Sequence, residues 1–233
     1  MKRFIIIFCI SLTAVNSYAQ KRKPQNQPYA DLKRYHLGFH VGLHTQDMVL
    51  TNNGIPAPNG NIWYGEIPSY SMGFCVGIIG NLYINQYLNL RFTPTVYFGD
   101  KNFTFIEEKT KETFTTSLRS NYLMFPFDLK YTAIRLNNYR PYMIGGVYNA
   151  FDMGRKKGVP LLSKGMDYGV SIGLGCDIYL PFFKLCPELK FYFGLADVLE
   201  KKRGDLLREE DRVYSNALSN GKSRMIVLTF NFE

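Results

Sequence analysis

The chain has 233 residues, of which 46% are hydrophobic and 15% aromatic, and its formal charge at pH 7 is +9. This length suits one domain. The composition excludes a helical membrane protein, because no segment reaches the roughly 18 consecutive apolar residues that a spanning helix needs.

The first residues have the order of a secretory signal. Two basic residues precede an apolar run over residues 4–12, and a small-residue exit follows at 17–19. This order predicts a signal peptide over residues 1–19 that is cleaved before Gln20. Loss of the two basic residues lowers the formal charge to +7. Export of the chain excludes nucleic acid as a partner.

Residues 20–34 form a basic tail. Around two prolines it carries Lys21, Arg22, Lys23, Lys33 and Arg34. Its composition predicts disorder on the periplasmic side. Two roles remain open for it: a solvated leader, or a contact segment for anionic lipid headgroups or a protein partner.

Eight later stretches alternate apolar with small or polar residues, which is the pattern of extended strands. They span residues 35–43, 70–82, 88–98, 123–131, 142–151, 168–180, 185–195 and 225–232. An even number of strands is required to close a barrel with both ends on one side. We therefore predict an all-β fold: an eight-stranded, antiparallel, up-and-down transmembrane β-barrel over residues 35–233.

The predicted connections are alternately short and long. Short turns follow the second, fourth and sixth strands. Long loops follow the others, over residues 46–69, 100–120, 152–166 and 197–223. In outer-membrane barrels the short turns are periplasmic, so the long loops are predicted to face outside. Apolar pairs at 206–207, 213–214 and 217–218 predict a short amphipathic helix in the last loop.

Alternation alone does not say which face of the barrel is outside, so a soluble lipocalin-like barrel is the alternative. The polar face of such a barrel would meet water and would be rich in Lys and Glu. Here the polar face is mostly Gly, Ser, Thr, His, Asn and Cys with a few charges. This composition suits a narrow, filled lumen, so the apolar face is expected to contact outer-membrane lipid.

Charged side chains on the polar face form the candidate site of the lumen. They are Arg91, Asp128, Lys130, Asp177, Glu188 and Lys190, joined by His36 and His40. Because buried charges need partners, we predict ion pairs between neighbouring strands, the third with the fourth and the sixth with the seventh. An eight-stranded barrel has room only for side chains, which favours a structural network over a pore or proton relay.

The three histidines, His36, His40 and His44, share one face of the first strand. Four residues of strand separate neighbouring members by roughly 13 Å, which is too far for one metal ion. No cofactor, metal or small-molecule substrate is predicted.

Three cysteines remain after the signal peptide. By strand phase Cys176 faces outward, whereas Cys75 and Cys186 face inward from strands that are not neighbours. Free thiols are therefore predicted, with a Cys75–Cys186 disulfide left open.

A catalytic triad at the outer rim is the enzymatic alternative. His44, Asp47 and either Ser69 or Ser71 would form it. No Gly-x-Ser-x-Gly elbow supports that set, so a non-enzymatic protein is predicted.

Five segments are specific enough to compare with a family. They are LGFHVGLHTQDM (37–48), YLNLRFTPTVYFGD (87–100), RLNNYRPYMIGG (135–146), GLGCDIYLPFFKLCPELKFYFGLADVL (173–199) and YSNALSNGKSRMIVLTFNFE (214–233). These segments resemble the PorT family, outer-membrane barrel proteins of Bacteroidota. The likeness covers nearly the whole exported chain and is most specific in the last two segments.

The resemblance implies a non-enzymatic component of the type IX secretion pathway. That pathway carries proteins with a C-terminal signal domain across the outer membrane and in some species supports gliding. Other components of the pathway are the partners that the resemblance implies, and it brings no catalytic residues. A small structural or adhesin barrel without a secretion role remains the alternative, and a lipid-modifying barrel enzyme is a further one.

Overall fold

Antiparallel β-strands make up most of the computed structural model, which describes residues 25–54, 63–69, 71–107, 113–154, 164–200 and 218–233. The predicted signal peptide and the start of the basic tail lie outside these residues. A short 3-10 helix, η2 (Ala30–Leu32), precedes the first strand. Within the described ranges, no helix combines the length and the apolar character needed to span a membrane.

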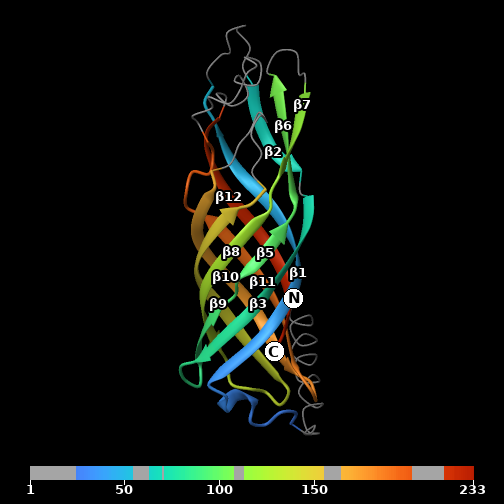
Figure 1. The fold of residues 1–233 in the computed structure, drawn as a ribbon, viewed down its shortest axis with the longest axis vertical. Helices are drawn as coiled ribbons and strands as arrows, with labels where there is room; N and C mark the ends of the chain where they lie inside the picture. The colour runs from blue at the N-terminus through green and yellow to red at the C-terminus, as the bar shows by residue number, and fades with distance from the viewer. Residues whose placement is uncertain (1–24, 55–62, 70, 108–112, 155–163, 201–217) are drawn as a thin grey trace, which may run out of the picture.

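Strands at eight positions close into a ring (Figure 1). They are β1 (Tyr35–Asn52), β3 (Ser71–Tyr83), β4 (Leu88–Phe92) with β5 (Thr95–Phe98), β8 (Tyr122–Thr132), β9 (Tyr139–Asp152), β10 (Met166–Tyr179), β11 (Lys184–Gly194) and β12 (Leu218–Phe232). Each pairs antiparallel with its neighbours, and β1 closes the ring by pairing with both β3 and β12. The predicted up-and-down barrel is confirmed.

The third predicted strand is split into β4 and β5. Pro94 lies at the break, and proline has no N–H with which to continue the ladder. The wall stays continuous, because β3 and β8 each pair with both halves. Two hydrogen bonds bridge the gap, from Thr93 N to Pro126 O (3.3 Å) and from Ile78 N to Pro94 O (3.1 Å).

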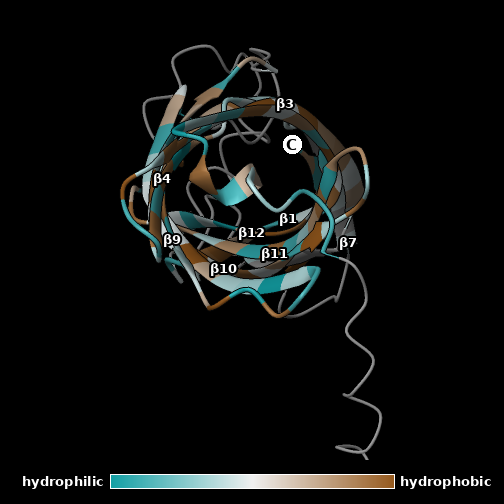
Figure 2. Ribbon diagram, turned by 90° about the horizontal axis from the view of Figure 1, so that it is seen from below, coloured by the Kyte–Doolittle hydropathy of each residue, from teal (hydrophilic) through white to brown (hydrophobic). Residues whose placement is uncertain are grey.

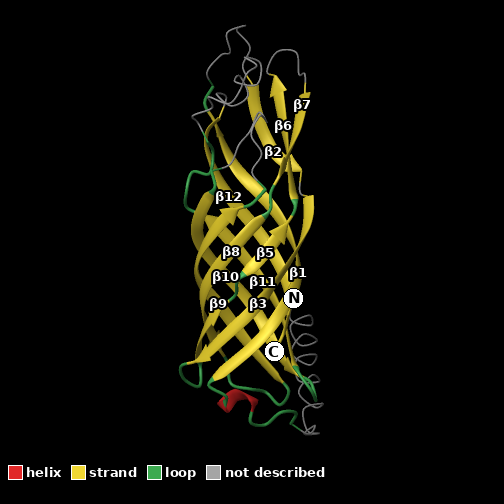
Figure 3. Cartoon of the chain, viewed as in Figure 1, coloured by secondary structure: helices red, strands yellow, loops and turns green. Residues whose placement is uncertain are grey.

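The long connections predicted as loops contain further strands, which corrects the sequence interpretation. β1 and β12 pair as far as Asn52 and Leu218, well beyond the predicted ends. Beyond the ring, β2 (Trp63–Ser69), β6 (Asp100–Glu107) and β7 (Thr113–Arg119) form a separate three-stranded sheet (Figure 3). A strand outside lipid needs no apolar face, so these segments lack the alternation that marks the others. Most of the predicted helix near 206–218 lies outside the described residues.

Side-chain burial settles which face is outside. Along β1, β3 and β10 the apolar residues are exposed, for example Leu37 at 80%, Phe74 at 56% and Leu174 at 59%. The charged residues Arg91 and Asp128 are fully buried in the lumen. This is the arrangement of a barrel in lipid and excludes the soluble alternative.

The short connections lie at the end of the barrel where β12 finishes (Figure 1). They span residues 84–87, 133–138 and 180–183. Seen from this end, the segment with η2 lies across the mouth of the ring (Figure 2). The predicted disorder of the tail is therefore wrong for residues 25–34, which fold against the barrel.

Candidate functional site

Glycines on one strand make room for large inward side chains on the next. His44 on β1 pairs in register with Gly73 on β3, and Tyr142 on β9 pairs with Gly175 on β10. A Cβ atom added to Gly175 would lie 2.3 Å from Cζ of Tyr142. The phenol ring therefore lies directly over the glycine backbone, and its hydroxyl reaches the charged groups in the middle of the lumen.

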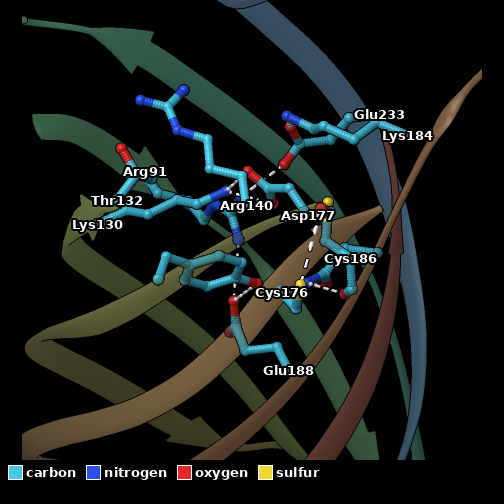
Figure 4. A network of polar contacts seen from close by, with 12 residues as sticks. Arg91, Lys130, Thr132, Arg140, Cys176, Asp177, Lys184, Cys186, Glu188 and Glu233 are labelled. Carbon is cyan, nitrogen blue, oxygen red and sulfur yellow. Dashed lines mark hydrogen bonds and ion pairs between the residues drawn. The ribbon is translucent and has the colours of Figure 1, made fainter. Parts of the chain in front are cut away.

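Figure 4 shows the first layer of charges, which lies near the short-turn end because β11 begins at Lys184 and β12 ends at Phe232. The Lys130 ammonium donates to both carboxylate oxygens of Asp177 at 2.7 Å. Arg91 donates to Glu233 Oε1 at 2.6 Å, and Lys184 forms an ion pair with the same carboxylate. The sequence analysis missed Lys184 and Glu233. Both lie at strand ends and have the phase of inward residues, and this phase could have identified them.

The second layer joins opposite walls of the barrel. Glu188 on β11 accepts hydrogen bonds from Arg91 at 2.9 Å and from Tyr142 Oη at 2.7 Å. Lys190 lies 2.9 Å from Asp128 and 3.1 Å from Glu188. Each charge therefore has a partner of opposite sign, as burial requires.

The predicted pairing between neighbouring strands is wrong. Arg91 and Asp128 are register partners on β4 and β8, yet neither pairs with the other, and each forms an ion pair with a residue of β11. Lys130 on β8 likewise pairs with Asp177 on β10, two strands away. Inward side chains of adjacent strands point in nearly the same direction. Because an eight-stranded barrel is narrow, their charged ends reach side chains from more distant strands across the lumen.

An aromatic layer lies above the charges. It contains Tyr97, Tyr148 and Tyr192, whose rings contact one another edge to face. His44 packs against the Tyr97 ring with 5.2 Å between centroids, while His40 Nε2 lies 3.0 Å from the Thr95 hydroxyl.

His36 is half-buried near the short-turn end.

Among the described residues, no cluster of His, Cys, Asp or Glu could hold a metal ion.

Two cavities border these layers and measure about 10 and 20 Å³. Each has room for about one water molecule.

Asp31 anchors the segment that covers the short-turn mouth. Its carboxylate accepts hydrogen bonds from Arg140 at 3.0 Å, from Arg135 at 3.3 Å and from the Tyr179 hydroxyl. Asn26 adds two contacts: its backbone N–H donates to Asn138 Oδ1 at 2.8 Å, and its side-chain amide donates to Tyr179 O at 2.9 Å. We call residues 25–34 the N-terminal cap.

The rim residues considered for catalysis do not assemble. Both His44 and Asp47 are buried, but by strand phase His44 faces the lumen, whereas Asp47 lies on the outer face and forms an ion pair with its register partner Arg224. Ser71 begins β3 opposite Gln46, so the separation of His44 from Asp47 is what rules out the set, and the side chain of Ser69 lies outside what the structure describes.

The thiols of Cys75, Cys176 and Cys186 are free. Cys75 and Cys186 are buried in the lumen, and Cys176 is partly exposed.

The closed ring with an apolar exterior agrees with the comparison to known families. The outer membrane protein beta-barrel domain family matches residues 18–200. The chain belongs to this family. Its outer-membrane location, expected from the sequence, is thereby confirmed. No curated protein sequence matches the chain.

Solved structures similar to this barrel are also small outer-membrane proteins. Neisserial surface protein A is 12% identical with a TM-score of 0.45, over 85% of this chain and 98% of that one. OprG from Pseudomonas aeruginosa is 12% identical with a TM-score of 0.42, over 91% and 95%. Ail of Yersinia pestis is 11% identical with a TM-score of 0.34, over 86% and 99%.

Proposed function

We propose that this barrel is a non-enzymatic accessory component of the type IX secretion pathway, which acts by contact with other components during export of cargo with a C-terminal signal domain. The sequence resemblance to the PorT family carries the proposal. The packed lumen supports action by contact, because trans-lumen ion pairs and water-sized cavities leave no path for a polypeptide.

Two parts of the structure are available for such contact. One is the β2–β6–β7 sheet beyond the ring, on the side of the long connections. The other is the N-terminal cap at the periplasmic mouth. We propose that the lumen network of His36, His40, Arg91, Asp128, Lys130, Asp177, Glu188 and Lys190 is structural and holds the barrel rigid between these two parts.

Deletion of the gene tests the proposal, with cargo at the cell surface as the readout. The deletion strain is expected to retain cargo inside the outer membrane, and the intact gene is expected to restore export. Normal cargo delivery in the deletion strain would contradict the secretion role. Assembly of an unrelated outer-membrane barrel serves as the control for general damage to the membrane.

Complementation with shortened chains identifies the contact part. Ser120 N donates to Gly99 O at 2.9 Å, so the two ends of the β6–β7 hairpin already lie together. Residues 100–119 can therefore be removed with little strain on the ring, and residues 25–33 can be removed separately. Heat-modifiable migration on a detergent gel checks that each shortened chain still closes its barrel.

A structural or adhesin barrel is the second candidate, because the β2–β6–β7 sheet extends the wall away from the membrane. In that case the hairpin deletion would reduce attachment to surfaces while export continued. His44→Ala and Asp47→Ala test the enzymatic alternative, since full rescue by both variants excludes a rim triad.

A further inference from the structure

The outer wall changes from apolar to charged at one level of β1 and β12. On β1 the outward residues from Tyr35 to Leu43 are exposed and apolar, Thr45 and Asp47 follow above them, and Val49, 49% exposed, is the next outward residue. On β12 the outward residues from Phe232 to Ile226 lead up to Arg224, the register partner of Asp47. A tilted strand crosses the hydrocarbon in about 9–11 residues, so this pair stands where the hydrocarbon ends on the side of the long connections, in the outer leaflet.

The cation is the exposed member of the ion pair at this level. Asp47 Oδ1 accepts the N–H of Met48 at 2.7 Å, and Oδ2 accepts Arg224 Nε at 3.2 Å. The Asp47 side chain is only 4% exposed, whereas that of Arg224 is 41% exposed. Lys222 is exposed two residues further up the same outward row. One covered carboxylate thus lies beside two accessible cations.

An apolar groove begins beside these cations. It has a volume of about 290 Å³, and Thr45, Phe191, Phe193 and Ile226 line it together with the ion pair. Phe191 pairs in register with Ile226, and Phe193 pairs with Arg224. The groove therefore runs from the charged level down into the apolar belt of the wall.

We propose that this groove binds a phosphorylated lipid of the outer leaflet, with a phosphate against Arg224 and Lys222 and an acyl chain along Phe191, Phe193 and Ile226. Charge complementarity at the upper end selects an anion, and guanidinium and ammonium groups are the usual partners of phosphate. The lower end faces hydrocarbon, where an acyl chain fits the apolar walls. A lipid satisfies both ends with one molecule.

The test uses the full chain refolded in detergent micelles and native mass spectrometry. The probes are diphosphorylated lipid A, the same lipid without phosphates, and inorganic phosphate alone. We expect the phosphorylated lipid to stay bound and the dephosphorylated lipid to bind markedly less. Equal retention of the two lipids would overturn the proposal, and so would full competition by inorganic phosphate.

Two variants leave the ion pair intact. Lys222→Gln is expected to weaken retention of the phosphorylated lipid about fivefold, as for loss of one cation at an anionic membrane surface. Phe193→Ala is expected to weaken retention of both lipids, because it shortens the apolar wall. Lys33→Gln, at an exposed position on the opposite end, is the matched control and should change nothing.

Arg224→Gln alone leaves Asp47 unpaired, so it is combined with Asp47→Asn, and migration on a detergent gel checks that the barrel has closed. This double variant is expected to lose preference for the phosphorylated lipid. Unchanged preference would overturn the proposal. So would photocrosslinking from position 193 in native membranes that captures a protein in place of lipid.

Discussion

Arg91 on β4 and Glu188 on β11 meet across the lumen, with Nη1 2.9 Å from Oε2. Their strands are four positions apart in a ring of eight, so the pair ties together walls that share no backbone hydrogen bonds. Both side chains are almost completely buried.

Glu188→Gln is expected to lower the free energy of unfolding by about 3–5 kcal/mol, because it leaves buried Arg91 and Lys190 short of an anion. Urea unfolding of the refolded chain in micelles measures this. The double variant Arg91→Met with Glu188→Met should cost less than the sum of the single changes. A Glu188→Gln variant as stable as the exposed control Lys222→Gln would refute the structural role of the network.

Gly175→Ala is expected to destabilise the barrel by about 1–3 kcal/mol, because the added Cβ atom would overlap the Tyr142 ring. Gly80→Ala is the matched control, since its Cβ atom would meet only Phe92 O at an ordinary 3.8 Å. Unfolding in urea compares the two variants. Equal stabilities would contradict the close approach of Tyr142 to the β10 backbone.

Asp31→Ala is expected to release the N-terminal cap, because it removes the acceptor shared by Arg135, Arg140 and Tyr179. Loss of these charge-assisted hydrogen bonds should raise the rate of trypsin cleavage after Lys33 about tenfold or more. Leu32→Ala, at an exposed position of the same helix, is the control. Equal cleavage rates would show that Asp31 does not hold the cap.

The thiols are expected to differ in reactivity towards maleimide in the folded barrel. Cys176 is partly exposed on the lipid side and should be labelled in detergent, whereas Cys75 and Cys186 should react only after unfolding. Mass spectrometry of the labelled peptides checks this order. A Cys75–Cys186 disulfide, or rapid labelling of either residue, would contradict the structure.

Much of the ring could be predicted because lipid imposes a rule on every strand that it touches. Period-two alternation marked all eight positions, and the phase of Lys130, Asp177 and Glu188 correctly pointed inward. The β2–β6–β7 sheet could not be found in this way, because outside lipid no alternation is required. The cap was missed for a related reason: its composition predicts disorder, and its order comes from contacts with Arg135 and Arg140, over 100 residues away in sequence.

The candidate site was also only partly predictable from the sequence. The sequence identified most of the lumen charges, although not Lys184 and Glu233, and it did not show which charges pair with each other. Strand pairing suggested that Arg91 would meet a neighbour on β8, whereas ring closure brings the opposite wall within reach. His44 and Asp47 are close in sequence but do not meet, because a separation of three residues along a strand places them on opposite faces of the wall.

By itself, the sequence determined the strand order, the lipid-facing side and most of the charged residues of the lumen, because each follows from local alternation against a membrane. Only the tertiary structure decided which charges meet, that residues 25–34 cover the mouth, and that Asp47 and Arg224 form a charged edge above an apolar groove. These depend on the diameter of the closed ring and the register of its strands, which bring together residues that no local pattern relates.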